Sequence, residues 1–343
     1  MKNIWYQFIK IYISTGLYFF YKKIKVVDVD NIPKKGAVLL VSNHKNALID
    51  PLIIATTMQR DIHFLTRASA FKIKAVYWFL STLNMLPIYR MRDGKETLAK
   101  NEAIFNACFD ILNANKCLLI FPEGTHDIKR WVRPLSKGFT RIAFGVFEKY
   151  PDINLHIVPV GLNYTNATNF AESVSVYYGK SFLANDFYNK NDINTSTLQL
   201  KEAVSEKLKA LTTHIDIEDY ENNIAQLGDV DFLKPKEVNQ MIKNLPNTGS
   251  KRILKNKPSV FWKILKYIIV VNSIIPLLIY RAFKPKIKEI EFISTTKFAI
   301  GITAFPLFYW LQSLLINHFF GGIIALTYFI ISIILVLVTA KTK

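Results

Sequence analysis

"AVLLVSNHKNALIDPLII", residues 37–54, contains the change from strand to loop to helix on which the predicted fold depends. Residues 37–42 are apolar up to a final serine, which is typical of a strand buried in a parallel sheet. Pro51 marks the start of a helix over residues 51–58, because proline at the first helical position gives up no hydrogen bond. Asp50 then falls at the N-cap, where aspartate is among the preferred residues.

The same alternation of strands and helices continues along the chain on both sides of this stretch. Further strands are predicted at 26–29, 117–121, 155–160 and 174–178, a short apolar run at 86–89, and further helices at 70–83, 97–113, 138–150 and 198–211. This pattern predicts an α/β domain over residues 25–215, with a largely parallel sheet flanked by helices. Residues 216–258 are more polar and contain Pro235 and Gly249, so they are interpreted as a polar linker or a loose subdomain.

The C-terminal part, residues 259–343, is predicted to be a membrane region. Residues 298–340 contain no Asp, Glu, Lys or Arg, and this run has room for two transmembrane helices of about 20 residues. Lysines flank both of its outer ends, which favours a hairpin with both ends on the cytoplasmic side. Residues 267–280 are too few for a regular span and include Pro276, so an interfacial or re-entrant segment is expected there. Core helices of a soluble domain are a less favoured explanation for so long an uncharged run.

The N-terminal residues 1–24 are predicted to form an amphipathic, membrane-associating helix. Aromatic and aliphatic side chains recur at helical spacing from Trp5 to Phe20, and lysines follow at Lys22 and Lys23. A helix that simply docks on the main domain is the alternative.

The net charge indicates which kinds of partner the protein could bind, and the two cysteines indicate whether disulfides or a metal site are expected. The net charge is +18, which suits an anionic membrane surface, a phosphorylated substrate or nucleic acid. The basic residues are dispersed and no aromatic RNA-binding motif is visible, so a nucleic-acid partner is not expected. Cys108 and Cys117 have the spacing of neither a disulfide framework nor a metal site, and buried free thiols are expected.

Polar residues follow several of the predicted strands, at the sheet edge where ligands of α/β proteins bind. His44 follows the strand 37–42, Glu123 follows 117–121 and Arg90 follows 86–89. If Asp50 accepts a hydrogen bond from one nitrogen of His44, the other nitrogen is free to act as a base. With no obvious serine or cysteine nucleophile nearby, this pair suits direct deprotonation of a substrate hydroxyl. A structural histidine and an aspartate that only caps the helix are the alternative.

Four blocks of sequence, in order, resemble the glycerolipid acyltransferases, the family of glycerol-3-phosphate and 1-acylglycerol-3-phosphate acyltransferases. The blocks are Asn43-His44 to Asp50, Leu86-Pro87-Ile88-Tyr89-Arg90, Phe121-Pro122-Glu123-Gly124-Thr125, and Val158-Pro159-Val160-Gly161-Leu162-Asn163-Tyr164. Five residues separate the histidine and the aspartate here, whereas the family usually has four. His126 replaces the arginine that often follows the threonine.

The resemblance implies roles for these residues. His44 would be the catalytic base with Asp50 as its partner, and Arg90 would bind an acceptor phosphate. Glu123, Gly124 and Thr125 would position the acceptor, and Lys137 would add a phosphate contact. No cofactor and no metal are implied; the acyl donor is a thioester, either acyl-CoA or acyl-carrier protein.

The expected function is that of a membrane-bound O-acyltransferase of phospholipid synthesis. Its partners would be the lipid bilayer, the acyl donor and a phosphorylated glycerol or lysophospholipid acceptor, and its catalytic domain would lie on the cytoplasmic face. An acyltransferase for a different lipid acceptor and a catalytically inactive lipid-binding protein are the alternatives.

Overall fold

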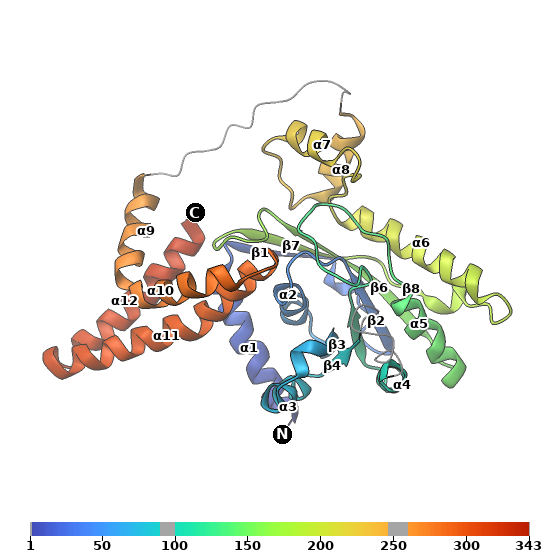
Figure 1. Ribbon diagram of the computed structural model, residues 1–343, viewed down its shortest axis with the longest axis horizontal. Helices are drawn as coiled ribbons and strands as arrows, with labels where there is room; N and C mark the ends of the chain where they lie inside the picture. The colour runs from blue at the N-terminus through green and yellow to red at the C-terminus, as the bar shows by residue number, and fades with distance from the viewer. Residues whose placement is uncertain (1, 90–99, 246–259, 343) are drawn as a thin grey trace.

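The computed structural model describes residues 2–89, 100–245 and 260–342, and its centre is a mixed, mostly parallel sheet (Figure 1). The strands are β1 (Lys23–Val27), β2 (Ala37–Ser42), β3 (Ile62–Arg67), β4 (Met85–Ile88), β5 (Cys117–Ile120), β6 (Leu155–Tyr164), β7 (Ser173–Tyr178) and β8 (Phe182–Leu183). Their order is β1-β7-β6-β2-β5-β3-β4, with β8 paired to β6. Only the β6–β7 and β6–β8 pairs among these are antiparallel, so the predicted largely parallel α/β fold is confirmed.

Helices cover both faces of the sheet. They are α1 (Lys2–Phe20), α2 (Ile49–Thr57), α3 (Lys74–Thr82), α4 (Lys100–Asn113), α5 (Gly138–Lys149) and α6 (Ile193–Leu211), with short 3₁₀ turns at Val29–Asn31, Ala68–Phe71 and Ala184–Phe187. Val38 and Leu40 of β2 pack in one core with α1 and α2, while Leu39 packs in the other core with α4, α5 and α6. This alternation follows from the two-residue period of a strand. Cys108 and Cys117 are buried free thiols, as predicted.

The largest differences from the predicted strands are in β3, in β6 and in β1, which begins at Lys23 instead of residue 26. β3 was not predicted, because only Ile62 and Phe64 of its six residues are buried and its apolar signal is short. β1 ends earlier than predicted, since Asp28 adopts a left-handed conformation with φ 57°. β6 continues to Tyr164 instead of ending at residue 160, because its last residues pair with β7. Within that extension, a Cβ on Gly161 would lie 2.3 Å from the Leu211 carbonyl oxygen, so only glycine fits without a shift.

The described part of the predicted linker is folded. It contains α7 (Tyr220–Leu227) and α8 (Pro235–Lys243), which pack around Ile215, Leu227 and Val238. These helices have only eight and nine residues and are mostly polar, so each repeats its apolar pattern over about two turns only. Residues 246–258 lie outside the described part of the chain.

The C-terminal region forms an apolar hairpin beside the sheet (Figure 1). Its helices are α9 (Val260–Asn272), α10 (Ile274–Phe283), α11 (Phe292–Phe320) and α12 (Gly322–Thr342), with a 3₁₀ turn at Lys284–Lys286. Helices α11 and α12 are long and apolar enough to cross a membrane, and Gly321 turns between them with φ 88°. Helices α9 and α10 are bent by 86° to each other, which fits a re-entrant or broken span where the short segment 267–280 was predicted.

Helix α1 packs against the main domain on one side and leaves an apolar face exposed on the other. Tyr6, Leu17 and Phe20 are buried, whereas Ile4 and Phe8 are 76% and 59% exposed. The end of α12 is tied to α1, since the Lys341 ammonium donates to the carbonyl oxygens of residues 18 and 21. Docking on the domain and an exposed apolar face therefore occur together in this helix.

Candidate active site

His44 is fixed at the carboxyl end of β2 by the residue before it. The Asn43 amide donates to the Leu162 carbonyl at 3.0 Å and accepts from the Leu162 N–H at 2.8 Å, so it prolongs the pairing of β2 with β6. The His44 ring stacks on Phe121 at 4.0 Å between centroids, and the His44 carbonyl accepts from the Asp127 N–H at 3.0 Å. The loops after β2 and β5 and the end of β6 therefore meet at this histidine.

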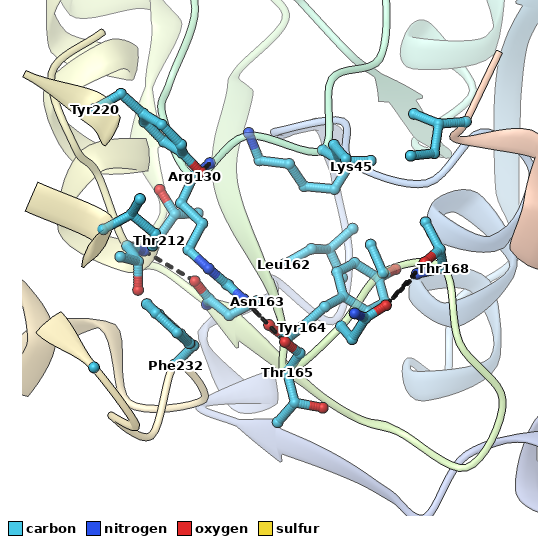
Figure 2. A pocket seen from close by; sticks show the side chains of 17 residues that line it. Lys45, Arg130, Leu162, Asn163, Tyr164, Thr165, Thr168, Thr212, Tyr220 and Phe232 are labelled. Carbon is cyan, nitrogen blue, oxygen red and sulfur yellow. Dashed lines mark hydrogen bonds between the residues drawn. The ribbon is translucent and has the colours of Figure 1, made fainter. Parts of the chain in front are cut away.

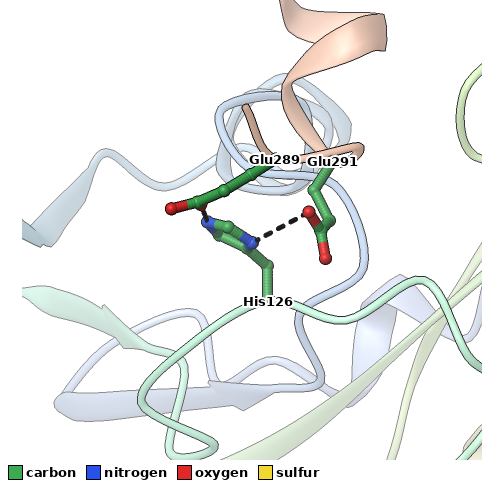
Figure 3. Close-up of side chains that lie close together, drawn as sticks. All are labelled: His126, Glu289 and Glu291. Atoms are coloured by element: carbon green, nitrogen blue, oxygen red, sulfur yellow. Dashed lines mark ion pairs between the residues drawn. The ribbon is translucent and has the colours of Figure 1, made fainter. Parts of the chain in front are cut away.

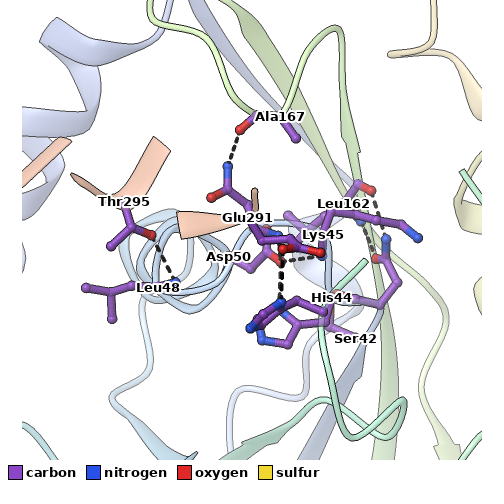
Figure 4. A network of polar contacts seen from close by, with 12 residues as sticks. Ser42, His44, Lys45, Leu48, Asp50, Leu162, Ala167, Glu291 and Thr295 are labelled. Carbon is purple, nitrogen blue, oxygen red and sulfur yellow. Dashed lines mark hydrogen bonds and ion pairs between the residues drawn. The ribbon is translucent and has the colours of Figure 1, made fainter. Parts of the chain in front are cut away.

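Asp50 is the partner of His44 (Figure 4). The His44 Nδ1 lies 2.8 Å from Asp50 Oδ2, and the Asp50 side chain is fully buried. The same oxygen accepts from the backbone N–H groups of Lys45 at 2.6 Å and Asn46 at 2.7 Å, and the Tyr164 hydroxyl donates to Oδ1. Because every neighbour donates to the carboxylate, Nδ1 of His44 carries the hydrogen and Nε2 is the free nitrogen of the neutral ring. The His44 side chain is 14% exposed, so this nitrogen can meet a substrate.

The predicted N-cap role of Asp50 is wrong. Helix α2 begins at Ile49, and the Asp50 N–H already donates to the Asn46 carbonyl at 3.0 Å. The turn over residues 45–48 starts the helix earlier than Pro51 indicated, and Pro51 lies within the first turn, where proline is tolerated. That turn and Ile49 make up the five residues between His44 and Asp50, and the wider spacing still lets the two side chains meet.

Glu123 is a buried carboxyl group in the tight turn after β5. Gly124 follows it with φ +70°, a left-handed conformation that favours glycine. Burial raises the pKa of Glu123 to about 7, and the nearby Lys45 and Arg133 only partly oppose this rise. Neither carboxyl oxygen has a hydrogen-bond partner among the described residues. A buried carboxyl group without a partner, beside a histidine–aspartate pair, is a candidate for contact with a bound polar ligand.

We expect Glu123→Gln to change the pH dependence of stability. Because the folded protein holds the Glu123 proton up to about pH 7 and the unfolded chain only to about 4.5, the wild type loses stability as pH rises through this window. This pKa shift corresponds to a loss of roughly 3 kcal/mol in the free energy of unfolding when Glu123 ionises. Glutamine does not ionise, so the variant should not show this loss. Melting temperatures measured from pH 5 to 8 should therefore fall further in the wild type than in the variant. Parallel curves would show that Glu123 is ionised when buried.

Lys45, which is buried, and Arg130, which is half-buried, are cations that sequence reasoning missed. The Lys45 ammonium donates to the carbonyl oxygens of Lys129 and Trp131 at 2.6 and 2.7 Å. The Arg130 guanidinium donates to the carbonyls of Tyr164 and Thr165 and lies 3.6 Å from the centre of the Phe232 ring. Both line a cavity of about 490 Å³ between the end of β6 and the α7–α8 pair (Figure 2). They hold the loop after β5 against β6 and so keep the His44 loop in place.

His126 connects the site to the C-terminal region. Its ring lies edge-on to His44 at 5.5 Å between centroids. Its Nε2 lies 3.2 Å from Glu289 and its Nδ1 lies 3.6 Å from Glu291, in the segment before α11 (Figure 3). Burial and the neighbouring His44 lower the pKa of His126, and the two glutamates partly oppose this. These three side chains lie close enough to be considered as metal ligands, but the two glutamates face opposite nitrogens of the ring, so one ion at either nitrogen would not meet both carboxylates in the same way.

The remaining predicted residues are placed unevenly around this centre. Thr125 is half-buried in the turn after Glu123, and Lys137 is exposed at the start of α5. The Ser136 N–H donates to the Pro122 carbonyl at 2.8 Å, so the residue before Lys137 is tied to the residue before Glu123. Arg90 lies outside the described residues.

Part of the chain is similar to known acyltransferases. Residues 23–163 match the acyltransferase family model. The chain is 29% identical over 123 residues to glycerol-3-phosphate O-acyltransferase 1 of Saccharomyces cerevisiae, which covers 34% of this chain and 16% of that protein. It is also 29% identical over 156 residues to a probable 1-acyl-sn-glycerol-3-phosphate acyltransferase of Mycoplasma pneumoniae, which covers 44% of this chain and 56% of that protein. Residues 23–163 are thus similar in sequence to the glycerolipid acyltransferases.

One solved structure is similar to part of this chain. The crystal structure of the 1-acyl-sn-glycerophosphate acyltransferase from Thermotoga maritima matches with a TM-score of 0.44 at 18% identity, covering 61% of this chain and 81% of that chain. The matched regions take up between about a sixth and just over half of the two curated relatives named above. The family model ends within β6, so α7, α8 and the C-terminal hairpin lie beyond it.

Proposed function

We propose that this chain is a membrane-bound O-acyltransferase of phospholipid synthesis. It would move a fatty acyl group from a thioester, acyl-CoA or acyl-carrier protein, to a hydroxyl of glycerol-3-phosphate or 1-acylglycerol-3-phosphate. The 2.8 Å contact between His44 Nδ1 and the buried Asp50 carboxylate carries the proposal, because it leaves Nε2 as a base at the ligand-binding edge of the sheet. Similarity to the acyltransferase family model supports the reaction type.

The reaction follows from this pair in two steps. Nε2 of His44 takes the proton of the acceptor hydroxyl while its oxygen attacks the thioester carbonyl carbon. The tetrahedral intermediate then collapses, the C–S bond breaks, and the proton passes from His44 to the leaving sulfur. Asp50 stabilises the imidazolium that exists between the steps, as the aspartate does in Ser-His-Asp triads. The products are the ester and the free thiol.

The acceptor is held by the residues named by the family resemblance. Glu123, Gly124 and Thr125 would position its polar groups, and Arg90 would bind a phosphate through its planar two-donor fork. Lys137 would add a second cation. The buried and unpaired oxygens of Glu123 support a hydrogen-bonding role toward a hydroxyl.

One observation favours an acceptor without a phosphate. Glu289 and Glu291 bring two carboxylates to His126, whose ring lies 5.5 Å from that of His44. Negative charge at this place would repel a phosphate dianion that bound close to the base. An acyltransferase for a different lipid acceptor is therefore the second candidate.

A matched panel of acceptors separates the two candidates. The detergent-purified chain would be supplied with acyl-CoA or acyl-carrier protein and with glycerol-3-phosphate, 1-acylglycerol-3-phosphate, or a 1-acylglycerol that lacks the phosphate. We expect the phosphorylated acceptors to be preferred. Arg90→Lys should raise their KM and leave the KM of the unphosphorylated acceptor unchanged. Preference for the unphosphorylated acceptor would favour the second candidate.

We also propose that the catalytic domain lies on the cytoplasmic face, with both ends of the α11–α12 hairpin on that side. Lysines flank the hairpin, and Asn317 is exposed close to its turn. In a chain without its two native cysteines, Asn317→Cys should react with a membrane-impermeant thiol reagent in intact cells, and Lys343→Cys should react only after permeabilisation. Reaction at position 343 in intact cells, with position 317 protected, would contradict this topology.

A further inference from the structure

Helix α3 does not pack like the crossover helix of a parallel sheet. It joins β3 to β4, yet none of its residues, 74–82, is buried. Trp78 is 67% exposed, Tyr77 51% and Phe79 39%, and Ile73 immediately before the helix is 66% exposed. A soluble domain rarely leaves several large apolar side chains of one helix in water, so such a face marks an interaction surface.

The packing of the neighbouring residues shows that α3 is attached at its ends only. Phe71 before the helix and Leu80 near its end contact the core shared with α1 and α2. The side chains from Val76 to Phe79 are all exposed. The helix is therefore held at the domain surface with its aromatic residues free to contact something else.

The exposed face of α3 continues into apolar surface on its neighbours. The Trp5 indole N–H donates to the Thr82 hydroxyl at 3.0 Å, which joins α1 to the end of α3. Trp5 stacks on Phe8, which is 59% exposed. Helix α1 in turn contacts α11 and α12. In Figure 1, α1 crosses the base of the hairpin, and α3 lies beside the N-terminal end of α1. The aromatic face of α3 thus belongs to the same surface as the two candidate membrane spans.

The charges around α3 are of one sign. Residues 62–92 contain no Asp or Glu, and Lys72 and Lys74 are exposed at the start of the helix. Lysines beside exposed Trp, Tyr and Phe are characteristic of helices that lie in a membrane interface, where the ammonium groups contact anionic headgroups.

We propose that α3 is a membrane-inserted helix whose exposed side chains, Ile73, Tyr77, Trp78 and Phe79, lie at the boundary between headgroups and acyl chains of an anionic bilayer. It would orient the catalytic domain on the membrane independently of the hairpin. Membrane contact by α3 can be measured without acyl transfer, so its test does not depend on the proposed reaction.

The test places a fluorescent probe on α3 in the full chain. Trp78→Cys would be labelled with an environment-sensitive dye, since the two native cysteines are completely buried. Leu198→Cys is the matched control, because Leu198 of α6 is 63% exposed but lies far from α1, α3 and the hairpin (Figure 1). Both labelled proteins would be reconstituted in vesicles of zwitterionic and anionic lipid with bromine on the acyl chains. Unchanged melting temperatures relative to the wild type would show that both variants fold.

We expect the acyl-chain bromine to quench the probe at 78 at least about twofold more than the probe at 198, as for a helix inserted several ångströms into the interface. The emission at 78 should also shift to the blue on reconstitution. Equal, weak quenching at both positions would overturn the proposal. The proposal would also be overturned if the blue shift at position 78 rose with protein concentration and energy transfer occurred between labelled copies. A second chain would then cover the exposed side chains of α3. If Trp78→Cys lowers the melting temperature, Phe79→Cys gives the same comparison.

Discussion

Replacing His44 by alanine is expected to lower kcat for acyl transfer by about 10²- to 10⁴-fold, the usual contribution of a general base. The fold should survive, because the His44 side chain makes its hydrogen bond only with Asp50 among the described residues and the loop is held by Asn43. The measurement is initial-rate kinetics on the purified variant, with its melting temperature as the check on folding.

His156→Ala provides the matched control for this variant. His156 is also a half-buried histidine, but it lies at the start of β6, at the opposite edge of the sheet from His44. Its replacement should leave kcat within a few-fold of the wild type. Near wild-type turnover in His44→Ala, or an equal loss in both variants, would contradict the assignment of His44 as the base.

Asp50→Asn is expected to lower kcat by a similarly large factor, up to about 10⁴-fold, as replacement of the aspartate does in Ser-His-Asp triads. Asparagine keeps an oxygen that can accept from the N–H groups of Lys45 and Asn46, but it carries no charge to stabilise the His44 imidazolium. If the amide NH2 faces His44 instead, it donates to Nδ1 and leaves the ring hydrogen on Nε2, which is the wrong tautomer. Activity should therefore fall steeply with little loss of stability.

Asp50→Ala should lose both activity and stability. It leaves the two buried backbone N–H groups and the Tyr164 hydroxyl without an acceptor, at a cost of about 1–3 kcal/mol for each buried group that finds no water. Tyr164→Phe is the matched control, since it removes only the contact with Oδ1 and should change kcat much less. An active Asp50→Asn beside an unstable Asp50→Ala would mean that the aspartate is structural, and Glu123 would be the first alternative partner for His44.

The sequence predicts the centre of the site better than its surroundings. His44 and Asp50 were expected to meet, and they do, although the expected helix start at Pro51 was wrong. The two side chains can meet whether the helix begins at Ile49 or at Pro51, because the turn over residues 45–48 brings Asp50 back toward His44. The glutamate block was recognisable because the strand ends directly before it, and its glycine is required by a left-handed turn.

The missed features depend on contacts between distant parts of the chain. Nothing in the local sequence shows that Lys45 donates to residues 129 and 131, or that Tyr164 reaches Asp50. The ion pairs of His126 come from Glu289 and Glu291, far outside the domain predicted over 25–215. The exposure of α3 was also unpredictable, because an apolar helix after a strand normally packs on the sheet.

Identification of the product of the wild-type chain tests the central claim most directly. Purified protein would be incubated with an isotopically labelled acyl thioester and the hydroxyl acceptors, with the lipid product identified by mass spectrometry and the released thiol titrated in parallel. The account predicts one new ester on a glycerol hydroxyl for each thiol released, and loss of both products in His44→Ala. Release of thiol with free fatty acid alone, or no ester on any hydroxyl acceptor with either donor, would contradict it.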